Sequence, residues 1–392
     1  MTIKLTERAQ RIQPSITLAL AAQASAMKKE GRDVINMAVG EPDFPAPEAV
    51  QRAAVRKVES GDVRYTAASG TLELKEALAR HLSATRSRTF GADQVVICHS
   101  SKHALTQAIL ATVQDGDEVL CPLPAWSSYF DIVGLAGGKP ILVEPKERGS
   151  VHPNLEGLKA AVTERTRVLM INSPNNPSGV VLDTNEITAL GEFAIENDLV
   201  LLSDEIYRAL VYDGPAPSPV EIAPEIAERT LIVDGASKVF AMTGYRIGYL
   251  AGPAGLIKAV SAMQSQMTGS PNAISQEAFR VALEKAPPET ETMRTAFAER
   301  REIILHGLQE LGLTTPRPGG AFYAFPDVSS YLDERGSGGF CADLLQEHAL
   351  ALVPGSAFGL DHHVRLSYAL GIDTIQEALR RLGEFLAAKK TT

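Results

Sequence analysis

The sequence predicts an α/β protein with a large, doubly wound, mostly parallel sheet and a second, smaller α+β unit. Short apolar runs alternate with amphipathic segments of helical period between about residues 90 and 252, which favours parallel strands joined by helices. Beyond about residue 254 the helices are longer and the strands shorter, and 392 residues are enough for both units. We expect an N-terminal arm with part of the small domain at 1–45, the large domain at 46–290 and the small domain at 291–392.

The predicted elements of the first two thirds of the chain follow from apolar periodicity and from the residues that bound each run. Helices are expected at 16–29, 48–59, 72–82, 104–113, 155–162 and 186–197. Strands are expected after residue 33, at 94–98, 117–121 and 139–143, from 167, from 198 to 205, and at 231–234 and 247–251. Turns dense in Gly, Pro and Asn separate these elements, as at 40–47 and 173–179.

The last third of the chain contains long amphipathic helices and a few short strands. Helices are expected at 254–268, 272–285, 291–311, 338–349 and 373–389. Short strands are expected within 321–327, 349–355 and 362–370. This mixture is typical of a compact α+β unit rather than of further βαβ repeats.

Composition and charge narrow the classes of function. The net charge is −9 and there is no basic block, so we expect neither nucleic acid nor a membrane as a partner. No apolar run approaches the roughly 20 residues that span a bilayer, and no secretory signal precedes the first helix. The three cysteines have no metal-type spacing, which predicts buried free thiols, a cytoplasmic location and no metal site.

Polar side chains follow several of the predicted strands at the point where each strand ends. Ser100–Lys102 follows the strand at 94–98, and Asn176 and Asp204 follow the next buried strands in the same way. Lys238 and Arg246 lie in the polar turn between the apolar runs 231–234 and 247–251. The carboxyl ends of parallel strands meet at one edge of a sheet, so these side chains are expected to share a crevice. A lysine desolvated there has a lowered pKa and can form a Schiff base with a carbonyl compound.

Six motifs in sequence order connect these residues to a known family. They are GEPDF (40–44), SPNNPSG (173–179), SDEIY (203–207), SKVFAMTGYRIGY (237–249), GGAFY (319–323) and VRLSYA (364–369). Together they resemble the class I aminotransferases, the aspartate aminotransferase family, and most closely its bacterial members. The resemblance covers almost the whole chain. It implies the type I fold of pyridoxal-phosphate-dependent transferases, and pyridoxal 5′-phosphate as the cofactor.

The resemblance implies a role for each matching residue at the cofactor. Lys238, Asp204 and Tyr207 are the implied catalytic residues: Lys238 binds the cofactor covalently and moves protons, and Asp204 pairs with the ring nitrogen. The other implied cofactor contacts are Tyr207 and Asn176 at the 3′-oxygen, Trp126 on the ring face, and Arg246 with Ser100, Ser101 and Lys102 at the phosphate. Tyr65 matches a tyrosine that reaches the phosphate of a neighbouring subunit, which implies a homodimer with shared sites.

The resemblance also implies a substrate class. Arg365 and Gly40 match contacts to the substrate α-carboxylate, which Trp126 and Asn176 adjoin. Lys102 and Ser15 match residues that select a distal carboxylate, although Lys102 as a phosphate contact or a solvated side chain stays open. The implied reaction is ping-pong transfer from L-aspartate to 2-oxoglutarate, giving oxaloacetate and L-glutamate.

Other functions share some of these features. Relatives with aromatic, alanine, methionine or prephenate specificity, β-lyases and cyclopropane-forming synthases use the same kind of site. Three positions depart from relatives: Ser100–Ser101 stands where many have Gly-Gly, and Gly235 stands where some have a serine. A DNA-binding regulator needs a basic module that the sequence lacks. A nicotinamide oxidoreductase is disfavoured because the glycines at 134–138 do not form G-x-G-x-x-G.

Overall fold

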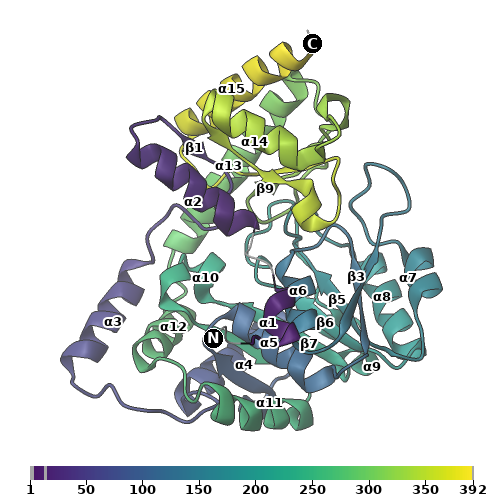
Figure 1. Cartoon of the computed structure of the whole chain (residues 1–392). Coiled ribbons are helices and arrows are strands. Elements are labelled where there is room, and N and C mark those ends of the chain that lie inside the picture. The colour runs from purple at the N-terminus through teal and green to yellow at the C-terminus, as the bar shows by residue number, and fades with distance from the viewer. Residues whose placement is uncertain (1–3, 13–15, 391–392) are drawn as a thin grey trace.

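The chain folds into two lobes, a larger one built on a central sheet and a smaller one above it (Figure 1). The structure is a computed structural model that describes residues 4–12 and 16–390. The central sheet has seven strands in the order β2-β8-β7-β6-β5-β3-β4. In that order the strands are β2 (Val95–Cys98), β8 (Gly248–Ala251), β7 (Thr230–Gly235), β6 (Val200–Asp204), β5 (Thr166–Asn172), β3 (Glu118–Pro122) and β4 (Lys139–Val143).

The central sheet is parallel except at β8, which runs antiparallel to both of its neighbours. The prediction of a mostly parallel sheet is therefore confirmed. Register matters for the site, because Asn172 at the end of β5 pairs with Asp204 at the end of β6, and Asp204 pairs with Val233 of β7. The polar ends of these strands thus lie side by side at one edge of the sheet.

Helices cover both faces of the central sheet, as the alternation of strands and helices predicts. They are α3 (Glu48–Glu59), α4 (Leu72–Thr85), α5 (Ser101–Thr112), α6 (Ser128–Leu135), α7 (Leu155–Ala161), α8 (Thr184–Glu196), α9 (Pro224–Ala227), α10 (Ala236–Val239), α11 (Ala254–Met267) and α12 (Ala273–Lys285). One apolar core joins β2, β3, β7 and β8 to α5, α6 and α11. Two further cores lie around α4 and α12, and around α8.

Three helices of the large lobe were not predicted, namely α6, α9 and α10. The segment of α6 follows a proline-rich stretch that favours a loop, yet its apolar residues Tyr129, Ile132 and Val133 are buried. The short α10 interrupts what the sequence suggested was a polar turn. Of these, α6 carries Tyr129 and α10 carries Lys238 to the edge of the sheet.

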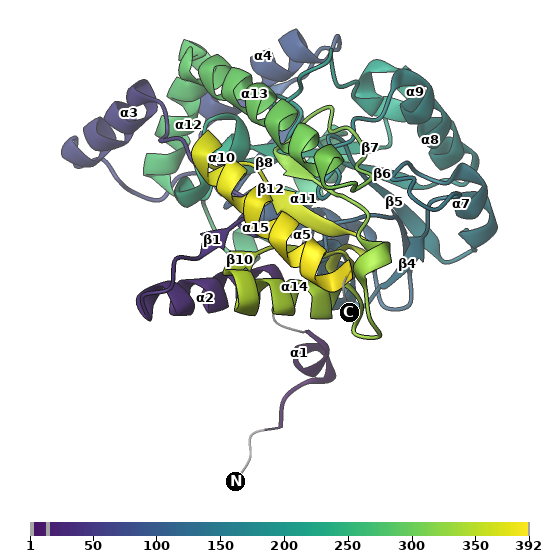
Figure 2. The ribbon, with the colours of Figure 1, turned by 90° about the horizontal axis from the view of Figure 1, so that it is seen from above.

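The small lobe combines segments from both ends of the chain. Its helices are α2 (Ile16–Lys29), α13 (Glu289–Glu310), α14 (Gly336–His348) and α15 (Ile372–Lys390), and α15 packs against α13 and α14 (Figure 2). Its strands are β1 (Ile35–Asn36), β9 (Tyr323–Ala324), β10 (Leu350–Ala351), β11 (Val353–Pro354) and β12 (Val364–Ser367). β11, β12 and β9 form an antiparallel sheet, whereas β1 pairs in parallel with β10.

The N-terminal helix α1 (Glu7–Arg11) contacts α6 and projects beyond the small lobe in Figure 2. Across the part of the chain that the structure describes, no helix combines the length and the apolar character needed to cross a membrane. The domain boundaries near residues 45 and 290 stay a prediction, although α13 begins at Glu289, next to the second of them.

Candidate functional site

A cleft of about 470 Å³ lies between the two lobes, at the ends of the central strands. Its walls include all the site residues predicted from the sequence except two. Tyr65 is the first exception: its side chain is 99% exposed and lines a separate surface hollow. Ser15 is the second, because it lies outside the described residues.

Lys238 is held at the base of the cleft by α10, directly after β7. Its Nζ donates a hydrogen bond to the backbone oxygen of Gly40 at 2.6 Å. Burial, aided by the charges of Arg365 and Arg246 and opposed by that of Glu41, lowers the pKa of Lys238 to about 8. A sizeable share of the amine is therefore uncharged near neutral pH, which is the form that attacks a carbonyl group.

Asp204 ends β6 and is the acidic group on the other side of the cleft. The hydroxyl of Tyr129 donates to its Oδ2 at 2.7 Å, and the backbone N–H of Ile206 donates to its Oδ1 at 3.2 Å. Burial raises the pKa of Asp204 to about 7, although the hydrogen bond from Tyr129 acts against this. A cation placed against this carboxylate would restore its charged form.

The turn from β2 into α5 supplies hydrogen-bond donors for an anion. Ser100 caps α5, its Oγ accepting from the backbone N–H of His103 at 3.2 Å. The Oγ of Ser101 is buried without a hydrogen-bond partner. Gly248 lies so close that a Cβ there would be 2.5 Å from the backbone nitrogen of Ser101. The missing side chain keeps this turn against the sheet, with the positive end of the α5 dipole facing the cleft.

Arg246 stands beside this turn in a left-handed backbone conformation, with φ of 53°. Its Nη1 donates to the backbone oxygen of Thr243 at 2.8 Å, and its side chain remains exposed in the cleft. Arg246, Ser100 and Ser101 line the same cleft, and the three residues together favour an anion with several oxygens.

Arg365 reaches the cleft from β12 of the small lobe and is fully buried. Its Nη1 donates to Asn176 Oδ1 at 2.9 Å and its Nη2 to the backbone oxygen of Ala38 at 2.7 Å. The guanidinium lies over the ring of Tyr323, 4.5 Å from its centroid, and its Nε has no partner. Burial lowers the pKa of Arg365, and a carboxylate in the cleft would compensate this buried charge.

Tyr207 and Asn176 lie between the acidic and the cationic side of the cleft. The hydroxyls of Tyr207 and Tyr323 are 2.8 Å apart, and the backbone N–H of Asn176 donates to Asn172 Oδ1 at 2.7 Å. Burial raises the pKa of Tyr207 well above its usual value, with Tyr323 adding to the effect. Tyr207 therefore stays protonated and can donate a hydrogen bond.

Lys102 and Trp126 line the outer part of the cleft. The Nζ of Lys102 is 4.6 Å from the centroid of the Trp126 ring and donates to Ser128 Oγ at 3.1 Å. Burial lowers the pKa of Lys102, and the charge of Arg246 adds to this effect. The half-buried Trp126 offers an aromatic face to the cleft beside a second cation.

Sequence reasoning missed three side chains that hold the site together. Tyr129 bonds Asp204, Tyr323 supports both Tyr207 and Arg365, and Asn172 holds Asn176. Tyr323 lies in the GGAFY motif, so a signal for it existed. The signal for Tyr129 was hidden, because α6 was expected to be a loop.

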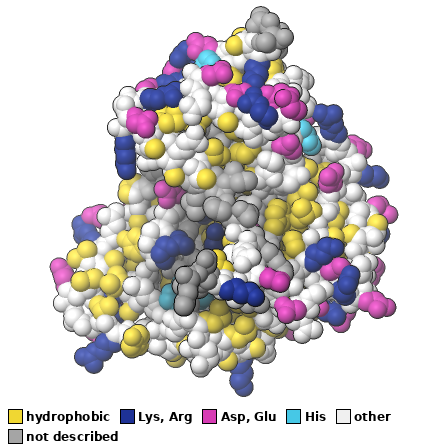
Figure 3. Space-filling view, viewed as in Figure 1, with side chains coloured by type: hydrophobic (Ala, Val, Ile, Leu, Met, Phe, Trp, Pro, Cys, Tyr) yellow, Lys and Arg dark blue, Asp and Glu magenta, His cyan; other side chains and the backbone are white. Residues whose placement is uncertain are grey.

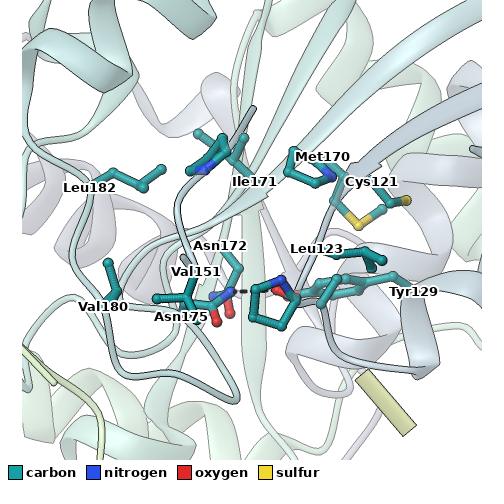
Figure 4. A pocket seen from close by; sticks show the side chains of 14 residues that line it. Cys121, Leu123, Tyr129, Val151, Met170, Ile171, Asn172, Asn175, Val180 and Leu182 are labelled. Carbon is teal, nitrogen blue, oxygen red and sulfur yellow. Dashed lines mark hydrogen bonds between the residues drawn. The ribbon is translucent and has the colours of Figure 1, made fainter. Parts of the chain in front are cut away.

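A second, much smaller cavity of about 30 Å³ adjoins the cleft (Figure 4). Tyr129 and Asn172 line both spaces, and Asn175 points into the smaller one, where its Nδ2 donates to the backbone oxygen of Pro124 at 3.2 Å. A space of this size holds about one or two water molecules. It is too small for a substrate.

The donors and acceptors of the cleft fit pyridoxal phosphate. Ser101 Oγ is an unused donor, Gly248 gives room beside it, and Arg246 adds a cation for a phosphate. The buried carboxylate of Asp204 needs a cationic partner such as a protonated pyridine nitrogen. Lys238, with its lowered pKa, is the amine that would bond the aldehyde carbon.

Comparison with known proteins places this geometry in a family. The model of the family described as "Aminotransferase class I and II" matches residues 32–382. Aspartate aminotransferase of Bacillus subtilis is 39% identical over 389 residues, covering 98% of this chain and 99% of that protein. Aspartate/prephenate aminotransferase of Thermus thermophilus is 40% identical over 385 residues, covering 97% and 98%.

Solved structures give the same result. The Thermus thermophilus aspartate aminotransferase with maleate superposes with a TM-score of 0.93 at 38% identity, covering 98% of this chain and 100% of that one. The Rhizobium meliloti aspartate aminotransferase gives a TM-score of 0.93 at 38% identity, covering 98% and 99%. The predicted type I fold, aminotransferase activity and pyridoxal phosphate cofactor are thereby confirmed. The chain belongs to the class I and II aminotransferases, as its six motifs and the geometry of its cleft indicate.

Proposed function

We propose that this aminotransferase moves the amino group of L-aspartate to 2-oxoglutarate, giving oxaloacetate and L-glutamate in two half-reactions. The observation that carries the proposal is the presence of three cations in one cleft besides Lys238, namely Arg365, Arg246 and Lys102. In this proposal, Arg246 binds the cofactor phosphate and Arg365 binds the substrate α-carboxylate. Lys102 then remains for a second carboxylate, which aspartate, glutamate and their oxo acids all possess.

The relatives support the same substrate class. Several proteins at 36–39% identity over nearly the full chain are named aspartate aminotransferase. A superposable structure is that of an aspartate aminotransferase with maleate, a four-carbon dicarboxylate. A dicarboxylate needs a cation at each end of its site, and this cleft has them.

Pyridoxal phosphate, when bound, supplies an electron sink for negative charge at the substrate Cα. Lys238 would hold the cofactor covalently and, as a free amine, would take the proton from Cα. Asp204 would keep a proton on the ring nitrogen through its negative charge, and Tyr129 fixes the orientation of that carboxylate. Tyr207 would donate a hydrogen bond to the 3′-oxygen, and the buried hydroxyl of Tyr323 holds Tyr207 in place.

Substrate orientation falls to the small lobe. Arg365 presents a guanidinium fork that is already held by Asn176 and Ala38, so little freedom is lost when a carboxylate binds. Trp126 lines the cleft beside Lys102 and would exclude water from one face of the bound ring.

A panel of amino donors tests this proposal. The full chain with pyridoxal phosphate is assayed with 2-oxoglutarate and aspartate, alanine, phenylalanine or methionine. We expect kcat/KM to be highest for aspartate, because only aspartate in this panel uses Lys102. A higher kcat/KM for phenylalanine or alanine would refute the dicarboxylate assignment while leaving the family assignment intact.

A second candidate acceptor is prephenate. Relatives at 37–40% identity are named aspartate/prephenate aminotransferase. Prephenate carries a ring carboxylate as well as an oxo acid group, so it also presents two carboxylates to Arg365 and Lys102. Replacing 2-oxoglutarate by prephenate, with aspartate as the donor, shows directly whether the chain accepts it.

We further propose a homodimer in which each active site receives Tyr65 from the neighbouring chain. Exposed large apolar side chains concentrate around α3 and the segment after it, namely Val55, Val58, Val63, Tyr65 and Leu72. Hydrophobic side chains also gather over α3 at the lower left of Figure 3. A surface of this kind favours association with another chain.

A mixing experiment tests the shared sites. Tyr65→Ala and Lys238→Ala chains, each with little activity alone, are unfolded together, refolded together and assayed. We expect activity to return, because a mixed dimer contains one site that carries neither change. Activity no higher than the sum of the two variants refolded separately would exclude sharing through Tyr65.

A cytoplasmic location is also part of the proposal. All three cysteines, Cys98, Cys121 and Cys341, are free and buried. Burial raises the pKa of each thiol, so these side chains are unreactive packing groups. Free thiols are the usual state in a reducing compartment, and localisation of the tagged full chain by fractionation checks the proposal.

A further inference from the structure

A cluster of three side chains that can bind a metal, one Asp and two His, lies in the small lobe, outside the cleft. Asp327 follows β9, and His362 and His363 precede β12. Backbone pairing brings the two segments together, because Asp327 and His363 form an isolated β-bridge and Val328 N–H donates to His362 O at 2.9 Å. One possible ligand atom from each of the three side chains lies within 4.8 Å of the other two.

His363 is the residue that points to a missing ligand. It is fully buried, at 0% exposure, and neither of its ring nitrogens has a hydrogen-bond partner. Its ring stacks on Phe325 with centroids 4.5 Å apart and planes 6° apart, which fixes its orientation. A neutral imidazole has one donor and one acceptor, and burying both without partners is costly. A bound ion at the acceptor nitrogen would remove part of this cost.

The other two side chains are oriented in a way that suits coordination. The backbone N–H of Ser329 donates to Asp327 Oδ1 at 2.7 Å, so the carboxylate is held by a second group, as metal-binding carboxylates usually are. The ring of His362 lies 4.3 Å from that of His363 and is only partly buried. This partial exposure gives an ion a path from solvent.

We propose that Asp327, His362 and His363 bind one divalent transition cation, with Zn²⁺ as the best match. Two imidazole nitrogens and one carboxylate oxygen form a usual donor set for zinc, with water at the fourth position. Tetrahedral bonds of about 2.0–2.1 Å place the ligand atoms about 3.3 Å apart. The three ligand atoms, which lie within 4.8 Å of one another, therefore need to move closer through small side-chain rotations. The sequence predicted no metal, because its three cysteines have no metal-type spacing.

Such an ion would fasten the loop before β12 to the segment after β9. His363 O already accepts a hydrogen bond from Gly355 N at 2.8 Å, and β12 carries Arg365 two residues further on. None of the three ligands lines the cleft. The proposed ion is therefore structural. It stabilises the segment that positions Arg365, and it takes no part in the chemistry of the cleft.

Zinc binding to the chelator-treated holoenzyme tests the proposal. Isothermal titration with Zn²⁺ alone, and the visible absorption of the protein with Co²⁺, measure stoichiometry and ligand type. We expect one ion per chain, a tetrahedral Co²⁺ spectrum, and a higher melting temperature with Zn²⁺. Asp327→Asn should weaken binding at least tenfold, and His363→Phe, which keeps a ring to stack on Phe325, should abolish it. His306→Ala, an exposed histidine of α13, is the matched control and should bind as the unchanged chain does.

Two results would overturn the proposal. One is the absence of saturable binding at one ion per chain. The other is equal binding by Asp327→Asn, His363→Phe and the unchanged chain, which would locate the ion elsewhere. The melting temperature of metal-free His363→Phe shows that this variant is folded, and His362→Ala gives a second, more exposed substitution if it is not.

Discussion

Replacing Lys102 with methionine separates the two roles that its position allows. The side chain keeps an unbranched apolar stem of similar size, but loses the charged Nζ that lies 3.1 Å from Ser128 Oγ and 4.6 Å from the centroid of the Trp126 ring. A hydrogen bond to a charged group contributes ~1.5–3 kcal/mol. Because Lys102 remains exposed in the open cleft, we take the lower part of that range. We therefore expect kcat/KM for aspartate to fall about 10- to 30-fold, since 1.36 kcal/mol corresponds to a factor of ten.

The assay compares substrates rather than absolute rates. Aspartate and alanine are measured with Lys102→Met, with the unchanged chain and with Lys258→Met, an exposed lysine on α11. The value of kcat/KM for alanine should stay within about twofold, because alanine has no distal carboxylate for Lys102 to bind. An equal loss for both substrates, together with weaker cofactor binding, would show that Lys102 serves the phosphate and would refute the reasoning.

Three further predictions follow from buried charges, two in the site and one elsewhere in the large lobe. Arg365→Lys keeps a charge but loses the fork held by Asn176, so kcat/KM for every amino donor should fall by about 10- to 100-fold in the same assay. Without cofactor, Asp204 has a raised pKa of about 7, so it destabilises the folded chain increasingly as pH rises from about 4 to 7. Asp204→Asn should remove this pH trend from the melting temperature of the cofactor-free chain and should raise the melting temperature at pH 8. The same variant should bind the cofactor more weakly. Arg86→Met removes the 2.8 Å ion pair of the buried carboxylate of Glu205, which keeps a longer contact of 3.7 Å with Arg208, and should cost ~3–5 kcal/mol in urea unfolding.

Each of these predictions has a result that contradicts it. For Arg365→Lys it is a loss confined to dicarboxylate donors, which would make Arg365 the distal contact. For Asp204→Asn it is an unchanged pH dependence of the melting temperature, which would show that the Asp204 carboxylate does not cause that dependence. For Arg86→Met it is a cost no larger than that of Arg52→Met, which removes an exposed ion pair with Glu48 and should cost under about 1 kcal/mol.

Much of the site was predictable because it lies at strand ends. Apolar strands with polar residues at their carboxyl ends identify one edge of a parallel sheet, and the structure brings Asn176, Asp204, Lys238 and Arg246 together there. The cleft also includes Arg365, which composition and periodicity alone did not connect to this edge. Arg365 was assigned to the site only through the motif VRLSYA, because β12 pairs with a strand that is distant in the sequence.

Other features were not visible in local sequence. The antiparallel β8 depends on the short return through α10, and two apolar runs in a row do not reveal their relative direction. Helix α5 begins at Ser101, three residues before the predicted start, because Ser100 caps it and the polar residues that follow are helical. Tyr129 and the cluster of Asp327 with His362 and His363 arise from contacts between distant segments, which periodicity does not encode.

The transfer of an amino group from aspartate through Lys238 is the centre of this account, and a single-turnover measurement tests it most directly. The chain loaded with pyridoxal phosphate is mixed with L-aspartate in the absence of any oxo acid, and oxaloacetate and ammonia are measured. We expect about one oxaloacetate per chain and no ammonia, because a ping-pong enzyme stops after its first half-reaction. Lys238→Ala should give none on the same time scale. Continuous release of ammonia, or an equal burst from Lys238→Ala, would contradict the account.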